Sequence, residues 1–161
     1  MSEPRWLSAD EQVNWRAWIA ASTLLQDRLG RELNAEHGLT MADYEILVRL
    51  SDAEGHRLRM SDLAEQSLSS RSRLSHQINR MEEAGLVKRE VCATDRRGFL
   101  AVLTDHGWKT LVSAAPTHVE GVRHHLLDQL TAEEFAALGA ACVKVAAHLQ
   151  SIRTPCEEPA P

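Results

Sequence analysis

Residues 61–104 read SDLAEQSLSSRSRLSHQINRMEEAGLVKREVCATDRRGFLAVLT, and this stretch decides the fold. It predicts a short helix over about Ser61 to Ser67, a turn, and a longer helix over Arg71 to Ala84. Ser70 is the expected N-cap of the longer helix. Gly85 is its expected end, because glycine readily adopts the left-handed backbone of a helix terminus. Two helices joined in this way are typical of a helix-turn-helix.

A β-hairpin is predicted directly after these two helices. Val87 to Cys92 and Phe99 to Thr104 are rich in β-forming residues, and they flank a polar tip from Ala93 to Gly98. The order of helix, turn, helix and hairpin predicts a winged helix-turn-helix. The expected fold class is therefore mainly α with a small β-wing.

The helix over residues 71–84 has a polar face that suits contact with DNA. In a helix-turn-helix the second helix enters the major groove, and an arginine there can bond O6 and N7 of guanine together. The alternative is a surface helix whose charges are simply solvated. We expect major-groove contacts from Arg71, Ser72, Arg73, Ser75 and His76, and backbone contacts from Ser70, Asn79 and Arg80.

The hairpin tip supplies a second candidate contact. The string Asp95-Arg-Arg-Gly98 places two guanidinium groups at the end of a narrow ribbon, and arginine fits the narrow, negative minor groove of A·T tracts. We expect Asp95, Arg96 and Arg97 to form this wing contact, with Asp95 accepting from an arginine and holding it extended. The alternative is an ordinary turn with solvated arginines.

The charge of the chain is unevenly distributed. Its 161 residues include 18 Lys and Arg and 23 Asp and Glu, a net charge of −5, which excludes a polybasic nucleic-acid coat. From Arg57 to Arg97, nine basic and six acidic residues give +3, so the rest of the chain carries −8. The acidity is therefore segregated from the predicted DNA-binding face.

Two helices are predicted before this region. Ser8-Ala-Asp-Glu11 is a capping box, and the helix that it opens stops at Gly38. Trp15 and Trp18 begin an apolar stripe at helical spacing along that helix. The next helix opens at Thr40.

Two more helices are predicted after the hairpin. Thr104 or Asp105 caps a helix that runs to about Gln129, and the capping box at Thr131 opens a last helix that ends before Pro155. The last helix carries apolar residues at alternating spacings of three and four, which is typical of a coiled-coil-like seam. The seam residues are Phe135, Leu138, Cys142, Val145, Leu149 and Ile152.

This seam predicts a homodimer. One chain of this length cannot easily cover both the seam and the stripe of Trp15 and Trp18, so we expect these residues at a dimer interface. The alternative is that both stripes pack within one chain.

Five strings of the chain together resemble the MarR family of bacterial transcription regulators. The resemblance implies a homodimer joined through its N- and C-terminal helices, binding to a palindromic operator, and usually repression. In the wing motif it assigns Arg97 to the minor groove and Asp95 to orienting that arginine. The strings are Leu63-Ala-Glu, Ser70-Arg-Ser-Arg-Leu-Ser-His, Arg80-Met-Glu-Glu-Ala-Gly-Leu-Val-Lys-Arg89, Thr94-Asp-Arg-Arg-Gly98 and Leu103-Thr-Asp-His-Gly107.

The resemblance also implies how a single domain over residues 1–161 is organised. Residues 8–38 and 105–153 would be dimerisation helices, residues 40–104 the DNA-binding lobe, and residues 154–161 a flexible tail. A small phenolic or other anionic ligand that releases DNA would lie between the helices and the lobe. The candidates for its pocket, each otherwise plain core or interface, are Trp15, Arg16, Arg49 and Trp108.

Other chemistry has little support in the sequence. The cysteines Cys92, Cys142 and Cys156 are too scattered for a disulfide framework, and we expect no thiol sensing. Neither metal-ligand spacings nor the motifs of an enzyme are present, so we expect no metal, no cofactor and no catalysis. Without a long apolar run or a signal peptide, the expected location is the cytoplasm.

The expected function is a DNA-binding transcription regulator. One alternative is a winged-helix module for protein interaction that does not bind DNA. Another is a small-molecule binding protein without an operator.

Overall fold

The first helix begins and ends where its sequence predicts. In the computed structural model, which describes residues 3–92 and 95–152 but not the side chains of residues 95–97, α1 spans Ala9–His37. The hydroxyl of Ser8 accepts from the amide of Glu11, whose carboxylate accepts from the amide of Ser8, so the predicted capping box is confirmed. Gly38 ends the helix with a left-handed backbone, φ 66°.

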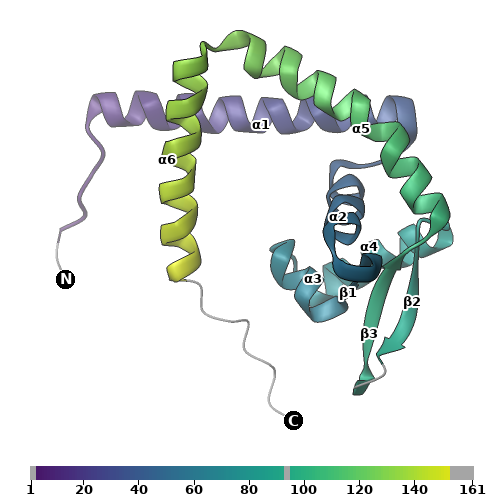
Figure 1. Ribbon diagram of the computed structural model, residues 1–161. Helices are drawn as coiled ribbons and strands as arrows, with labels where there is room; N and C mark the ends of the chain where they lie inside the picture. The colour runs from purple at the N-terminus through teal and green to yellow at the C-terminus, as the bar shows by residue number, and fades with distance from the viewer. Residues whose placement is uncertain (1–2, 93–94, 153–161) are drawn as a thin grey trace. The chain divides into compact units, whose positions relative to one another are not determined.

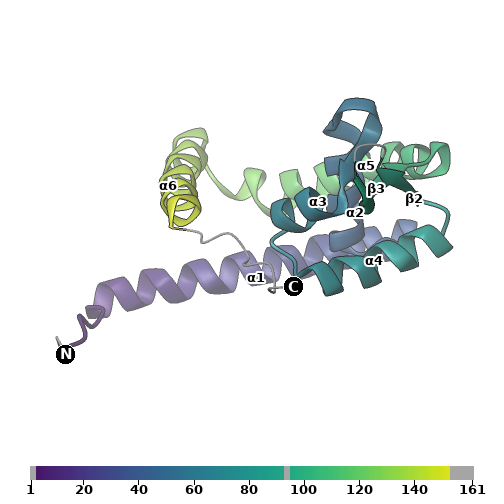
Figure 2. The ribbon, with the colours of Figure 1, turned by 90° about the horizontal axis from the view of Figure 1, so that it is seen from below.

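Three further helices and a small sheet follow, and they confirm the predicted winged helix-turn-helix. The helices α2, α3 and α4 lie together beside the β2–β3 hairpin in both views (Figures 1 and 2). The sheet is antiparallel, with the strand order β1-β3-β2. The elements are α2 (Met41–Asp52), a 3-10 turn (Glu54–His56), β1 (Arg57–Arg59), α3 (Met60–Gln66), α4 (Arg71–Glu83), β2 (Val87–Cys92) and β3 (Asp95–Leu103).

The hairpin differs from the prediction at its tip. The strand β3 begins at Asp95 rather than Phe99, so the polar string is mostly strand and not a six-residue loop. Val91 pairs with Phe99, but the next residue, Cys92, pairs with Asp95, so the register shifts there. Such an irregularity absorbs extra residues of one strand, which composition alone does not reveal.

The apolar residues of α4 anchor it in the core. Leu74, Ile78 and Met81 are buried, as their spacing predicts. Their burial leaves the polar face of the helix directed away from the core. The largest fully buried side chains of the described residues are Leu33, Ile46, Leu47, Leu50, Leu63, Leu74, Ile78, Met81 and Val87.

The helix after the sheet, α5 (Asp105–His125), is capped by Thr104 rather than Asp105. The Thr104 hydroxyl accepts from the amide of Gly107 at 3.0 Å and donates to the carbonyl oxygen of Gly85 at 2.6 Å. The helix ends before the predicted Gln129, because Leu126 leaves the helical region, and a 3-10 turn follows over Leu127–Gln129.

By its internal contacts the chain divides into two compact units, Met1–Gly121 and Val122–Pro161. Within the first unit, the hydroxyl of Thr117 on α5 donates to Glu36 at 2.7 Å. Because that hydroxyl has one proton to give, it accepts from Nε2 of His37, 2.9 Å away. The last turn of α1 is therefore tied to the middle of α5.

The second unit contains the last helix, α6 (Ala132–Ser151). Thr131 and Glu134 form the predicted capping box. The helix stops at Ser151, ahead of Pro155, and none of its residues is buried. In the part of the chain that the structure describes, every helix is too short or too polar to cross a membrane.

Candidate nucleic-acid interface

The recognition-helix candidate α4 presents most of its predicted contacts to solvent. The extended backbone of Ser70 starts the helix, and its hydroxyl accepts from the amide of Arg73 at 3.2 Å. Ser75 is half-buried, because it faces the wing strand β2. The exposed predicted residues on this helix and its cap are Ser70, Arg71, Ser72, Arg73, His76, Asn79 and Arg80.

A shallow groove of about 480 Å³ lies along this face. It brings together five of the predicted contact residues and one residue of α2. Two guanidinium groups at one open groove make an electropositive surface of the kind that phosphates occupy, and the His76 imidazole lies beside them. The groove is lined by Ala42, Ser70, Ser72, Arg73, His76, Gln77 and Arg80.

An aspartate that the sequence did not single out lies behind this groove. Asp43 of α2 accepts from the side-chain amide of Gln77 at 3.2 Å, and its Oδ1 lies 3.8 Å from a guanidinium nitrogen of Arg80. Its other oxygen accepts from the Thr40 hydroxyl at 2.6 Å. Because Thr40 and Gln77 hold the two oxygens of the Asp43 carboxylate, this carboxylate can restrain the guanidinium of Arg80 at the groove. The capping pattern of Thr40 and Asp43 was the only sequence signal for it.

A second missed residue, Arg89 of β2, connects the wing to α4. Its guanidinium donates to the main-chain oxygen of Ser75 at 3.0 Å, to Glu82 at 3.0 Å and to the side-chain oxygen of Asn79. Its backbone amide also donates to Glu82 at 2.9 Å. No local sequence pattern pairs Arg89 with α4, which ends at Glu83.

The predicted wing contacts lie outside the described side chains. Asp95, Arg96 and Arg97 have backbone positions at the start of β3, and their contacts with DNA stay a prediction. Nearby on β2, Lys88 and Glu90 form an ion pair of 2.7 Å, and the hydrogen bond from Lys88 lowers the pKa of Glu90.

The predicted dimer residues are largely uncovered in each unit. On α1, Trp15 is 55% exposed and Trp18 is 45% exposed. On α6, Leu138 and Cys142 are half-buried. The other seam residues are exposed, namely Phe135, Val145, Leu149 and Ile152.

The four candidates for a ligand pocket do not gather at one place. Arg49 lines a cavity of about 500 Å³ that also touches α1 and α5. Trp108 instead lies with its ring centroid 5.0 Å from that of His56, and Trp15 and Arg16 are exposed on α1. The cavity is lined by Gln26, Leu29, Met41, Tyr44, Glu45, Val48, Arg49, Asp52 and His118.

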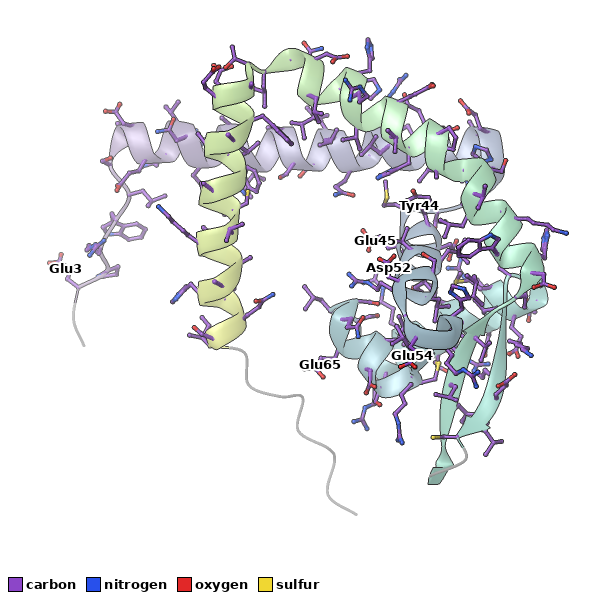
Figure 3. The ribbon with its side chains drawn as sticks, viewed as in Figure 1. Glu3, Tyr44, Glu45, Asp52, Glu54 and Glu65 are labelled. Atoms are coloured by element: carbon purple, nitrogen blue, oxygen red, sulfur yellow. The ribbon has the colours of Figure 1, made fainter. Side chains whose placement is uncertain are left out.

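Two nitrogens at this cavity lack hydrogen-bond partners among the described residues. They are Nε of Arg49 and Nδ1 of His118, and both are buried. The ring of His118 lies 4.7 Å from that of Tyr44, and burial lowers the pKa of His118, which favours its neutral form. Tyr44, Glu45 and Asp52 all come from α2 (Figure 3).

The cysteines and the acidic residues show no sign of metal chemistry where the structure describes them. Cys92 is buried and Cys142 is half-buried, while Cys156 and the predicted tail over residues 154–161 lie outside the described residues. Among the described residues, no group of three or more His, Cys, Asp or Glu is placed to hold a metal ion.

The fold and this surface define a winged helix-turn-helix protein. A sequence model of the MarR family matches residues 37–98. The transcriptional regulator HosA of Escherichia coli is 32% identical over 119 residues, which cover 74% of this chain and 86% of HosA. The chain belongs to the MarR family of transcriptional regulators, a family that is not a class of enzyme.

Solved structures of the same family are similar over nearly the whole chain. AbsC, a MarR family regulator of Streptomyces coelicolor, is 51% identical with a TM-score of 0.86, covering 92% of this chain and 99% of AbsC. Sco3205 of the same organism, solved in complex with DNA, is 45% identical with a TM-score of 0.88, covering 93% of this chain and 94% of Sco3205.

Proposed function

We propose that this protein regulates transcription by binding a palindromic operator in double-stranded DNA as a homodimer, with α4 in the major groove and the wing in the minor groove. The observation that carries the proposal is the face of α4, which is anchored by buried Leu74 and Ile78 and exposes Arg73 and His76 beside a groove. The DNA complex of Sco3205, 45% identical to this chain, supports it.

A two-fold arrangement gives this function a geometric test. Paired recognition helices lie about 34–36 Å apart, one turn of DNA, so the bound sequences are expected to be inverted repeats with that spacing. Selection from a random pool of duplex DNA, followed by mobility shifts at two salt concentrations, measures both the sequence and the spacing. A pool without enriched inverted repeats would favour the alternative, a winged-helix module for protein interaction.

We also propose that the protein represses transcription and that a bound ligand releases it from DNA. A ligand in the cavity at Arg49 and His118 could supply partners for their two buried nitrogens, and it would touch α1, α2 and α5 at once. Glu45 and Asp52 also line this cavity, so a phenol or a monoanion fits better than a ligand with more negative charge.

Salicylate tests this ligand proposal. We expect it to raise the melting temperature and to weaken the operator shift, and we expect Arg49→Met to abolish both effects. Arg16→Met is the matched control, because Arg16 is exposed on α1 and does not line the cavity. Equal salicylate responses in both variants would remove Arg49 from the site, and a ligand effect without loss of DNA binding would contradict release.

A further inference from the structure

Arg89 is committed to contacts inside the protein. Its guanidinium donates to three residues of α4, namely to Ser75, to the side-chain oxygen of Asn79 and to the carboxylate of Glu82. Only 21% of its side chain is exposed, and its charge is offset by the 3.0 Å ion pair with Glu82. A basic residue held in this way is unsuited to neutralising a phosphate itself.

The contact with Arg89 decides how Asn79 faces solvent. A guanidinium carries donors and no acceptor, so the Asn79 atom that faces it must be the carbonyl oxygen. The amide nitrogen therefore points the other way, with its two N–H groups. Asn79 is exposed, and it lies three residues after His76 and four after Ser75, on the same side of α4.

An asparagine fixed in this orientation cannot read a base in the usual way. Bidentate recognition of adenine needs both the amide nitrogen and the carbonyl oxygen of one asparagine, for N7 and N6 respectively. Arg89 takes one lone pair of the oxygen and holds the carbonyl toward β2, so Asn79 turns its amide nitrogen, which has donors only, toward solvent. Phosphate oxygens are acceptors only, and they are the matching partner.

We propose that Arg89 is a positioning residue, which turns Asn79 into a donor-only contact for a DNA phosphate and thereby excludes Asn79 from base reading. The inference rests on the proposed function, and it adds which chemistry Asn79 recognises and what holds it. The same contacts set the distance between α4 and β2, so the wing strand and the recognition helix approach DNA as one piece.

Three variants test this assignment by operator affinity over a range of salt concentrations. Asn79→Ala is expected to weaken the operator and unrelated DNA by the same factor, about threefold to tenfold, because one sequence-independent hydrogen bond is lost. Arg89→Met is expected to weaken binding similarly, and the double variant should be little weaker than Arg89→Met alone. The salt slope, which is the slope of log affinity against log salt concentration, should stay unchanged in all three variants. None of them removes a charge that contacts a phosphate.

Arg80→Gln is the matched control, because Arg80 is an exposed cation on the same helix. Its loss is expected to reduce the salt slope by about one. Selection of bound sequences with Asn79→Ala should return the unaltered operator. A changed base preference in that selection, a reduced slope in Arg89→Met, or multiplying effects in the double variant would overturn the assignment.

Asn79→Asp keeps the test independent of how well Arg89→Met folds. The aspartate still accepts from Arg89 but presents an acceptor to the phosphate, so binding should fall further than with alanine. Binding at the level of the unmodified protein would overturn the inference. If the unmodified protein binds no DNA at all, the proposed function fails first, and the result is distinguishable from a failure of the Asn79 assignment alone.

Discussion

Leu68 occupies a backbone conformation that costs free energy. Its φ is 52°, and its side chain is 75% exposed, so little burial offsets the strain. The residue closes the turn between α3 and α4, where its amide donates to the carbonyl oxygen of Glu65 at 3.2 Å and that of Ser69 donates to Ala64 at 3.0 Å. Glycine is the usual residue at such a helix end, because it has no Cβ to clash.

Leu68→Gly is therefore expected to stabilise the protein. Relief of the left-handed strain is worth about 1–2 kcal/mol, and the larger entropy of the unfolded chain takes back part of it. We expect a net gain of about 0.5–1 kcal/mol in the free energy of unfolding, measured with urea. Leu68→Ala is the control, because alanine loses the exposed side chain but keeps the strain. An equal gain with alanine would contradict the strain argument.

Arg73 is the residue most suited to reading a base. It lies in the first turn of α4, is exposed, and lines the groove together with Ser72 and His76. Arg73→Ala is expected to cost about 1–3 kcal/mol in operator binding and to relax the preference at one base pair per half-site. Competition shifts with operators mutated at single positions measure both effects. Unchanged affinity and preference would show that this end of α4 does not face the bases.

At the scale of elements, α5 meets the wing through a glycine. A Cβ added to Gly107 would lie 2.0 Å from the carbonyl oxygen of Leu86 and 2.8 Å from Cδ1 of Leu103. The first turn of α5 can therefore approach the start of β2 only without a side chain at residue 107. Thr104 reinforces the approach, because its hydroxyl connects this turn to the backbone at Gly85.

Gly107→Ala is expected to destabilise the fold by about 2–3 kcal/mol, because backbone atoms must move to admit the methyl group. The free energy of urea unfolding measures the loss. Gly139→Ala on α6 is the matched control, since nothing lies within 4 Å of its added Cβ and alanine favours a helix. We expect Gly107→Ala to lower the free energy of unfolding and Gly139→Ala to raise it. Equal destabilisation by the two substitutions would contradict the packing argument.

The elements also show which parts of the structure local sequence could predict. The helix starts at Ser8 and Thr131 were predictable, because a capping box lies within four residues of chain. The start of β3 was not, because its register depends on a shift opposite Val91. The role of Arg89 was equally invisible, since its partners on α4 are brought to it by the sheet. The polar face of α4 was predictable because burial of its other face follows helical periodicity.

At the scale of the whole molecule, the exposed apolar residues of α6 are the observation behind the proposed homodimer. Val145, Leu149 and Ile152 are each more than half exposed, and such a continuous apolar face on a monomer is unusual. A second copy of the chain is the occupant that also suits an inverted-repeat operator, because each copy contributes one recognition helix.

Leu149→Glu is expected to separate the proposed dimer, because a carboxylate on the seam cannot be buried without a partner. Light scattering after size-exclusion chromatography measures the mass, and operator shifts should weaken by more than about tenfold, since the second half-site no longer binds as part of one molecule. Val143→Glu is the matched control: Val143 is also exposed on α6, but it lies outside the seam, so the dimer and the operator shift should persist. A dimer that survives Leu149→Glu would remove the seam from the interface, whereas a monomer that still binds the full operator tightly would show that DNA, and not α6, brings the two copies together.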